Sequence, residues 1–303
     1  MVEFSNNVNL TYWILVLGSS VARILPLRIS YALGAAIGDL VFYTWRNKRN
    51  AAIANMRQVL GPDVAEAEVR RTARASYRNY LKYTVDFLRF PSLDCQAIKR
   101  ATTIVGTENL DRALAAGKGV IFVSVHFGHF DLGAAVLAIS GYPVNAVVDT
   151  FTPPKLNELI QRQRKEKGVK VIPIETAGRA VLRALRQNEI LGLLVDRPMP
   201  GEGVRVDFCG APIEVPAGAA ALALKTGAPI VPGYLLKASD KAFHGVIMPS
   251  IEAKPSGDLR RDIVTVTQQF MRALEEGVRR HPDQWYMFRH MWEDGSLRPV
   301  AAG

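Results

Sequence analysis

After Thr107, short apolar runs rich in β-branched residues alternate with longer segments in which apolar residues recur at helical spacing. The apolar runs predict strands at residues 120–125, 144–149, 169–174, 190–196, 204–208 and 230–236. The segments around them predict helices at residues 107–119, 154–168, 177–188, 217–227 and 258–280. Strands that alternate with helices in this order favour a mainly parallel sheet flanked by helices. The sequence therefore predicts an α/β fold.

The segment between residue 50 and Thr107 has helical spacing. Residues 50–61 predict a helix that Gly61 ends, and residues 64–91 predict a longer helix that Pro91 ends. In the longer helix aromatic residues alternate with arginines and lysines, a pattern found on nucleic-acid stacking surfaces and also on ordinary core faces. The helical spacing favours a core face, and we expect these helices to pack on the α/β core.

Residues 1–50 predict a membrane-associating helical segment. The run from Leu10 to Ala22 carries no charge, but it is shorter than the roughly 20 residues that a straight transmembrane helix needs. Apolar residues then recur at helical spacing from Ile29 to Val41, and a tryptophan with a basic cluster follows at residues 45–49. We expect helices that lie on a membrane surface or make one short span. Two core helices of a soluble lobe are the alternative.

The formal net charge of +10 on 303 residues predicts an anionic partner, which could be nucleic acid, an acidic protein or a phospholipid surface. Cys95 and Cys209 are far apart and outside any CxxC pair, so we expect neither a disulfide framework nor a structural zinc site. The sequence lacks a dinucleotide fingerprint, a phosphate-binding P-loop and a GxSxG elbow. This argues against dehydrogenase, NTPase and α/β-hydrolase functions.

Two histidines and an aspartate crowd the segment VSVHFGHFDLG, residues 123–133, directly after a predicted strand. One interpretation is a metal site, although the zinc-hydrolase pattern HxHxDH is matched only at His129 and Asp131. A second is that polar residues at a strand end satisfy one another by local hydrogen bonds. The third is general-base chemistry, because open parallel sheets place ligand sites beyond the carboxyl ends of their strands.

General-base chemistry would give His126 and Asp131 unequal roles. A histidine can remove a proton from a substrate hydroxyl, and a carboxylate bonded to its other ring nitrogen fixes the tautomer and stabilises the imidazolium. The pair can form if the chain turns from strand into helix between the two residues. Since the motif supplies no serine or cysteine nucleophile, the attacking group would be the hydroxyl of the substrate.

The segment HFGHFD, with His126 and Asp131, resembles the HxxxxD/E motif of the lysophospholipid acyltransferase superfamily. The order of features along the chain resembles the bacterial lipid A biosynthesis branch, the lauroyl and myristoyl transferases, and the related phosphatidylinositol mannoside acyltransferases. The stretches that carry this resemblance are NMRQVLG (55–61), RQRKEKG (162–168), LLVDRPMPGEGVRVDFCGAPIEVPAGAAALALKTGAPIVPGY (193–234) and HPDQWYMF (281–288). It implies an acyltransferase domain at residues 51–303 with a glycerolipid acyltransferase-like fold.

The resemblance also implies roles for single residues of the histidine segment. His126 is the expected base and Asp131 its orienting partner. His129 stands where members of this branch often carry asparagine, which makes it a neighbour of the base. We expect no metal ion and no cofactor, because the acyl thioester is a co-substrate.

Four further residues are expected at the site. The resemblance implies an active-site arginine in the helix at 154–168, with Arg164 preferred and Arg162 as the alternate. Asp196 and Arg197 end a predicted strand on the same sheet edge as His126, where they would bind the acceptor headgroup or shape the following loop. Participation of Asp196 in the chemical step is not expected.

The implied reaction moves a fatty acyl group from acyl carrier protein or acyl-CoA to a hydroxyl of a glycolipid, such as a lipid A precursor. The expected partners are this membrane lipid acceptor, the acyl donor and an anionic membrane surface, without nucleic acid. The expected location is the cytoplasmic face of the bacterial inner membrane. Alternatives are a lysophospholipid acyltransferase or a thioesterase with the same residue pair, and a non-enzymatic basic protein that binds membranes or nucleic acid.

Overall fold

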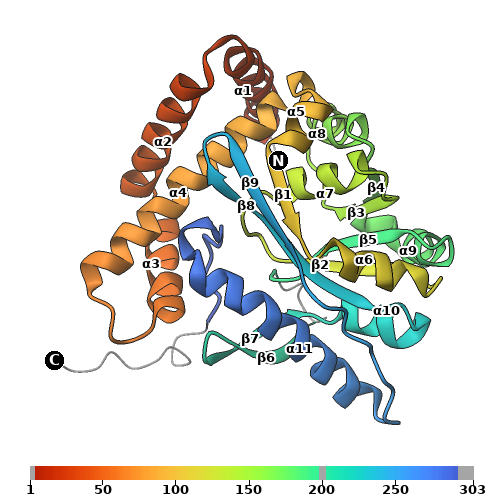
Figure 1. Cartoon of the computed structure of the whole chain (residues 1–303). Coiled ribbons are helices and arrows are strands. Elements are labelled where there is room, and N and C mark those ends of the chain that lie inside the picture. Colours follow the sequence, from red (N-terminus) through yellow and green to blue (C-terminus); the bar gives the residue numbers. More distant parts are fainter. Residues whose placement is uncertain (1–3, 198–202, 293–303) are drawn as a thin grey trace.

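The chain folds around a seven-stranded sheet in the order β1-β9-β8-β2-β5-β3-β4 (Figure 1). The computed structural model describes residues 4–197 and 203–292. The strands of this sheet are β1 (Thr102–Val105), β2 (Val120–Ser124), β3 (Val144–Val148), β4 (Lys170–Pro173), β5 (Ile190–Leu194), β8 (Ile230–Ser239) and β9 (Ala242–Ile247). Its neighbouring strands are parallel except for the antiparallel pair β8 and β9. The predicted mainly parallel sheet flanked by helices is confirmed.

Helices cover both faces of the sheet (Figure 1). They are α5 (Cys95–Arg100), α6 (Thr107–Ala115), α7 (Phe130–Ile139), α8 (Pro154–Glu166), α9 (Ala177–Arg186), α10 (Gly218–Thr226) and α11 (Leu259–Arg280), with short 3-10 helices η1 (Phe90–Ser92), η2 (Ile174–Thr176) and η3 (Pro282–Gln284). Because successive strand residues point to opposite faces, Val120 of β2 packs with Leu110 of α6, whereas Ile121 packs in the cluster that contains Phe270 of α11. Burial on both sides explains why this strand reads as an uninterrupted apolar run.

The predicted strand at 204–208 belongs to a separate two-stranded hairpin. It forms β6 (Gly203–Phe208), which pairs with β7 (Ala211–Pro216) in antiparallel register. The connecting residues Cys209 and Gly210 have φ of 52° and 81°, the left-handed pair that a two-residue hairpin turn requires. The hairpin is attached to α11 by reciprocal hydrogen bonds between the Gln268 side chain and the Asp207 backbone.

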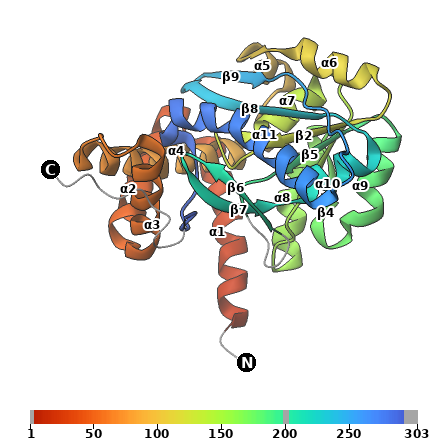
Figure 2. The same ribbon diagram turned by 90° about the horizontal axis from the view of Figure 1, so that it is seen from below.

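The described part of the chain begins with the helices α1 (Phe4–Ile24), α2 (Leu27–Thr44), α3 (Arg46–Leu60) and α4 (Glu66–Arg89). The predicted helices at 50–61 and 64–91 correspond to α3 and α4. α2 packs against α4 through its buried residues Tyr31, Gly34 and Phe42. Figure 2 shows that the N-terminal part of α1 projects away from the rest of the molecule, whereas its C-terminal part contacts α4. None of the helices in the described part of the chain is long and apolar enough to cross a membrane.

The apolar spacing seen at residues 29–41 lies mainly on the exposed side of α2. Exposed large apolar side chains continue onto α1, and we call this set the apolar face of α1 and α2. Its members are Trp13, Ile14, Leu17, Val21, Ile24, Ile29, Leu33, Ile37 and Leu40. The opposite side of α2 is the one that packs on α4, so the helix is apolar on both sides and only one side has a described partner.

Candidate active site

The loop between β2 and α7 carries the histidine segment. Backbone hydrogen bonds join this loop to the segment at residues 284–286. The Tyr286 N–H donates to the His126 carbonyl (2.8 Å), and the Gly128 N–H donates to the Gln284 carbonyl (2.8 Å). Gly128 has φ +62°, and a Cβ at this position would lie 2.0 Å from the Leu235 carbonyl oxygen. The turn at this position therefore fits only glycine. The two backbone hydrogen bonds fix the backbone of the loop at His126 and Gly128.

Asp196, and not Asp131, binds the His126 ring. Oδ1 of Asp196 lies 2.6 Å from Nδ1 of His126. Oδ2 of Asp196 accepts from the His126 backbone N–H (2.9 Å) and from Nε1 of Trp285 (3.1 Å). The prediction that Asp131 bonds to the His126 ring is wrong, because the first turn of α7 directs Asp131 to other elements while β5 delivers Asp196 to the ring.

The pairing of β2 with β5 explains this contact. These strands are parallel neighbours in which Ser124 is opposite Leu194, so His126 and Asp196, each two residues further on, meet at the carboxyl edge of the sheet. Burial raises the pKa of Asp196, but the charge of His126 and hydrogen bonds from His126 and Trp285 outweigh burial and lower it below its usual value. An ionised Asp196 holds a proton on Nδ1, and the structure describes no hydrogen-bond partner for Nε2 of His126.

Asp131 is bound by α8 and α4. Its Oδ1 accepts from Nε of Arg164 (2.7 Å), and its Oδ2 accepts from the Tyr83 hydroxyl (2.5 Å). Burial raises the pKa of Asp131, but Arg164 and the Tyr83 hydrogen bond lower it below its usual value. Burial of Tyr83 and the nearby carboxylate of Asp131 raise the pKa of Tyr83 well above its usual value. A buried ion pair therefore lies beside the His126–Asp196 pair.

Of the two arginines predicted in α8, Arg164 lies at this edge. Its side chain is 13% exposed, and Nη1 donates to the Gln161 side chain (2.8 Å). The Arg162 side chain is 62% exposed and its Nε lies 3.7 Å from Oε1 of Glu166. Their contributions to substrate binding remain predictions, but Arg162 points to solvent instead of to Asp131.

His129 lies in the interior. Its side chain is 1% exposed, its Nδ1 accepts from the Leu132 N–H (3.3 Å) at the start of α7, and its Nε2 is 3.5 Å from Oδ2 of Asp86. Asp86 also accepts from Nζ of Lys237 (2.8 Å) and from the Tyr31 hydroxyl. His129 therefore caps a helix and contacts a buried charge, and its side chain is almost fully enclosed.

Sequence reasoning missed four side chains that shape this edge: Tyr83, Asp86, Lys237 and Trp285. Trp285 lies inside the HPDQWYMF segment, which the resemblance had singled out as a block without giving a role to any residue. Asp86 and Tyr83 are on the aromatic face of α4, where a carboxylate among aromatic residues was an available signal. Nothing in the local pattern of β8 distinguishes Lys237 from a solvated lysine.

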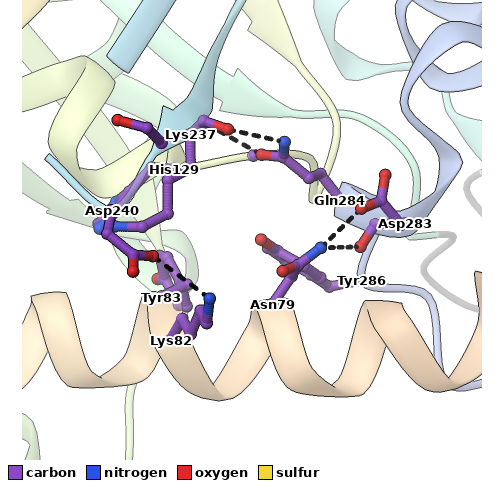
Figure 3. Close-up of a pocket in the computed structure, with 11 residues that line it drawn as sticks. Asn79, Lys82, Tyr83, His129, Lys237, Asp240, Asp283, Gln284 and Tyr286 are labelled. Carbon is purple, nitrogen blue, oxygen red and sulfur yellow. Dashed lines mark hydrogen bonds and ion pairs between the residues drawn. The ribbon is translucent and has the colours of Figure 1, made fainter. Parts of the chain in front are cut away.

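A cavity of about 160 Å³ lies between α4, the β8–β9 hairpin and η3 (Figure 3). It is lined by Asn79, Lys82, Tyr83, Gly128, His129, Lys237, Ser239, Asp240, Asp283, Gln284 and Tyr286. Its polar groups are largely paired, since Lys82 contacts Asp240 (3.3 Å) and Nδ2 of Asn79 donates to Asp283 (2.8 Å). Of the two histidines in the loop, His129 lines this cavity and His126 does not. Among the residues that the structure describes, no group of three or more histidine, cysteine or acidic side chains is arranged to hold a metal ion.

A family model described as bacterial lipid A biosynthesis acyltransferase matches residues 2–294. The chain is 27% identical over 245 residues to the phosphatidylinositol mannoside acyltransferase of Mycobacterium tuberculosis, covering 78% of this chain and 75% of that protein. It is 23% identical over 287 residues to the lipid A biosynthesis lauroyltransferase of Escherichia coli, covering 92% of this chain and 90% of that protein. Among solved structures it is similar to the 1-acyl-sn-glycerophosphate acyltransferase of Thermotoga maritima, with a TM-score of 0.37 and 14% identity over 83% of this chain and 97% of that chain.

Proposed function

Since the chain belongs to the bacterial lipid A biosynthesis acyltransferase family, we propose that it moves a fatty acyl group from an acyl thioester to a hydroxyl of a membrane glycolipid. The thioester would be acyl carrier protein or acyl-CoA, and a lipid A precursor is one example of an acceptor. The observation that carries the proposal is the His126–Asp196 pair at the carboxyl edge of the sheet, with Nε2 of His126 left for a substrate. The named relatives act on glycolipids, which supports this class of acceptor.

In the proposed reaction, His126 is the general base. The acceptor hydroxyl gives its proton to Nε2 as its oxygen attacks the thioester carbonyl, and Asp196 stabilises the imidazolium that forms. The tetrahedral intermediate then loses the thiol as the C–S bond breaks, and His126 returns the proton to the departing sulfur. Asp131, predicted as the orienting partner of the base, instead fixes Arg164 at the edge of the site. Arg164 would add positive potential where the carbonyl oxygen becomes negative.

We propose that the apolar face of α1 and α2 attaches the enzyme to the cytoplasmic face of the inner membrane. Several large apolar side chains exposed on neighbouring helices are typical of interaction surfaces, and Trp13 (63% exposed) and Leu40 (62% exposed) are large members. The exposed residues Arg28, in the first turn of α2, and Arg46, at the start of α3, would meet anionic lipid headgroups. Residues 1–50 would then be the membrane-associating segment and residues 51–303 the acyltransferase domain.

The reaction is tested with the purified chain, acyl carrier protein or CoA carrying a labelled acyl group, and a bacterial glycolipid extract in mixed micelles. Mass spectrometry should find the label on a glycolipid with wild-type protein and not with His126→Ala. The exposed α9 variant Arg183→Gln is the matched control and should keep wild-type transfer. Thiol release that is equally fast without any lipid acceptor would replace the transferase with a thioesterase.

Membrane attachment is tested by sedimentation with vesicles of phosphatidylethanolamine and phosphatidylglycerol. The double variant Leu33→Ser/Ile37→Ser changes the apolar face without touching the side of α2 that packs on α4, and it should lower the bound fraction about ten-fold or more. Ser substitutions at two exposed positions on the acyltransferase domain, Val105 and Leu259, are the control. Equal binding by both double variants would refute the assignment of this face.

A further inference from the structure

Arg197 is a half-buried arginine without a partner in the described part of the chain. It directly follows Asp196, and its Nε is fully enclosed and makes no hydrogen bond. The described residues offer it no ion pair either. Arg164 at the same sheet edge is the opposite case, since its Nε is bound to Asp131 and its Nη1 to Gln161. Burying a charged group without a partner is unfavourable, so an unpaired guanidinium at a reactive edge indicates that a ligand supplies the partner.

The adjacent carboxylate of Asp196 is directed to other groups. It contacts the His126 ring, the His126 backbone N–H and Trp285, and no hydrogen bond or ion pair with Arg197 is described. Burial lowers the pKa of Arg197 and the nearby charge of Arg289 lowers it further, while Asp196, Tyr80 and Asp149 act in the opposite direction. The net effect is unfavourable to the bare cation, which an anion brought by a substrate would relieve.

Arg289 adds a second positive charge to this place. Its backbone carbonyl accepts from the Asn55 side chain (2.7 Å), which fixes the backbone of the segment after η3. Its side chain is exposed and has no ion pair with any described residue. The exposed Arg289 is therefore close enough to act electrostatically on the half-buried Arg197, which directly follows Asp196 in the chain.

We propose that Arg197, assisted by Arg289, binds a phosphate group of a substrate. A guanidinium fork matches two phosphate oxygens, and two neighbouring cations favour a group that can carry more than one negative charge. This inference rests on the proposed function, since it names a chemical group on the substrates of that reaction. The phosphate can belong to the lipid acceptor or to the phosphopantetheine arm that carries the acyl thioester.

The first experiment titrates the full chain in detergent micelles with inorganic phosphate. Phosphorus NMR detects the binding. Arg197→Gln removes the charge and should weaken phosphate binding about ten- to a hundred-fold, because hydrogen bonds to charged groups are the strong ones. Arg289→Gln should weaken it less, since this side chain is exposed. Arg183→Gln on α9 is the control and should bind as the wild type does.

The second measurement finds the source of the phosphate. The donor arm compares kcat/KM for acyl-4′-phosphopantetheine with that for acyl-pantetheine. The acceptor arm compares phosphatidylinositol mannoside with a mannosyl diacylglycerol that lacks phosphate. Arg197→Gln should abolish the preference for the phosphorylated compound in one arm and leave the other arm unchanged, and the affected arm identifies the source. Arg197→Lys keeps the charge without the fork and should give an intermediate value, which covers the case in which Arg197→Gln does not fold.

Weaker phosphate binding together with loss of preference in one arm supports the proposal. It is overturned if Arg197→Gln binds phosphate as the wild type does, or if the preferences in both arms persist. Failure of the proposed function is a different result, because wild-type protein would then transfer no acyl group in any arm.

Discussion

His126 and His129 lie in one loop, yet their surroundings differ in every respect that matters for proton transfer. The His126 side chain is 14% exposed, and its Nδ1 contacts Asp196 while the structure describes no partner for its Nε2. The His129 side chain is 1% exposed and lies between the start of α7 and Asp86. A general base needs one nitrogen that reaches the substrate and one that is held by an acceptor, and only His126 combines the two.

The two aspartates of the site differ in the same way. Asp196 contacts the ring of the proposed base, whereas Asp131 contacts a guanidinium and a phenol. Removing the first should therefore change the chemical step, and removing the second should change the free energy of unfolding more than the chemistry. The comparison shows that the spacing of residues in a motif does not determine which carboxylate forms a hydrogen bond with which histidine ring.

The largest effect should come from His126→Ala. Without the base, acyl transfer should fall about 10⁴-fold in kcat/KM, because general-base catalysis supplies an acceleration of this order. Steady-state transfer of a labelled acyl group measures it, with circular dichroism and thermal unfolding to show that the fold is kept. Residual activity within ten-fold of the wild type would remove His126 from the mechanism.

The next effect should come from Asp196→Asn, which keeps the shape of the side chain and loses its charge. An amide can no longer stabilise the imidazolium, so kcat should fall about 10³-fold while the acceptor KM changes little. A larger loss with Asp131→Asn than with Asp196→Asn would reverse the roles given to the two carboxylates.

The α/β core could be predicted because strands buried on both faces give continuous apolar runs, as β2 does. β1 and β9 were missed: Thr102–Val105 alternates between partly buried and exposed positions, and its apolar content is too low to stand out. His126 could be picked out as a polar residue after a buried strand. Its pairing with Asp196 could not, because β5 follows β2 only after β3 and β4 in the chain, and the sequence does not give the order of strands in the sheet.

The buried ion pair between Asp131 and Arg164 should also contribute to the stability of the fold. Arg164→Gln leaves the Asp131 carboxylate buried without its cation and should lower the free energy of unfolding by about 3 kcal/mol. Urea unfolding measures it, and Arg162→Gln on the exposed side of the same helix is the control, with an expected change within about 0.5 kcal/mol. Equal changes in the two variants would show that the Asp131–Arg164 contact contributes nothing to folding.

The same pair predicts a dependence on pH. The folded protein holds the pKa of Asp131 below the value of about 3.9 that the unfolded chain has. The stabilisation by this carboxylate is therefore fully present above that pH, and it is lost as the pH falls through the lower pKa of the folded state. The difference in unfolding free energy between wild type and Asp131→Asn should be constant from about pH 7 to about pH 5 and shrink towards pH 2. A difference that grows on acidification would contradict the ion pair.

The smallest effect should come from His129→Asn. Asparagine can still accept the Leu132 N–H at the start of α7, so the helix cap is kept and the cost should be below about 1 kcal/mol. Acyl transfer should stay within about three-fold of the wild type, since the proposed reaction gives the proton to Nε2 of His126 and not to His129. His129→Ala removes the cap and should cost about 1 kcal/mol more in thermal unfolding, again with little change in kcat. A loss of transfer by His129→Asn that approaches the loss by His126→Ala would mean that both histidines take part in the reaction, and the contrast between the two environments would no longer identify the base.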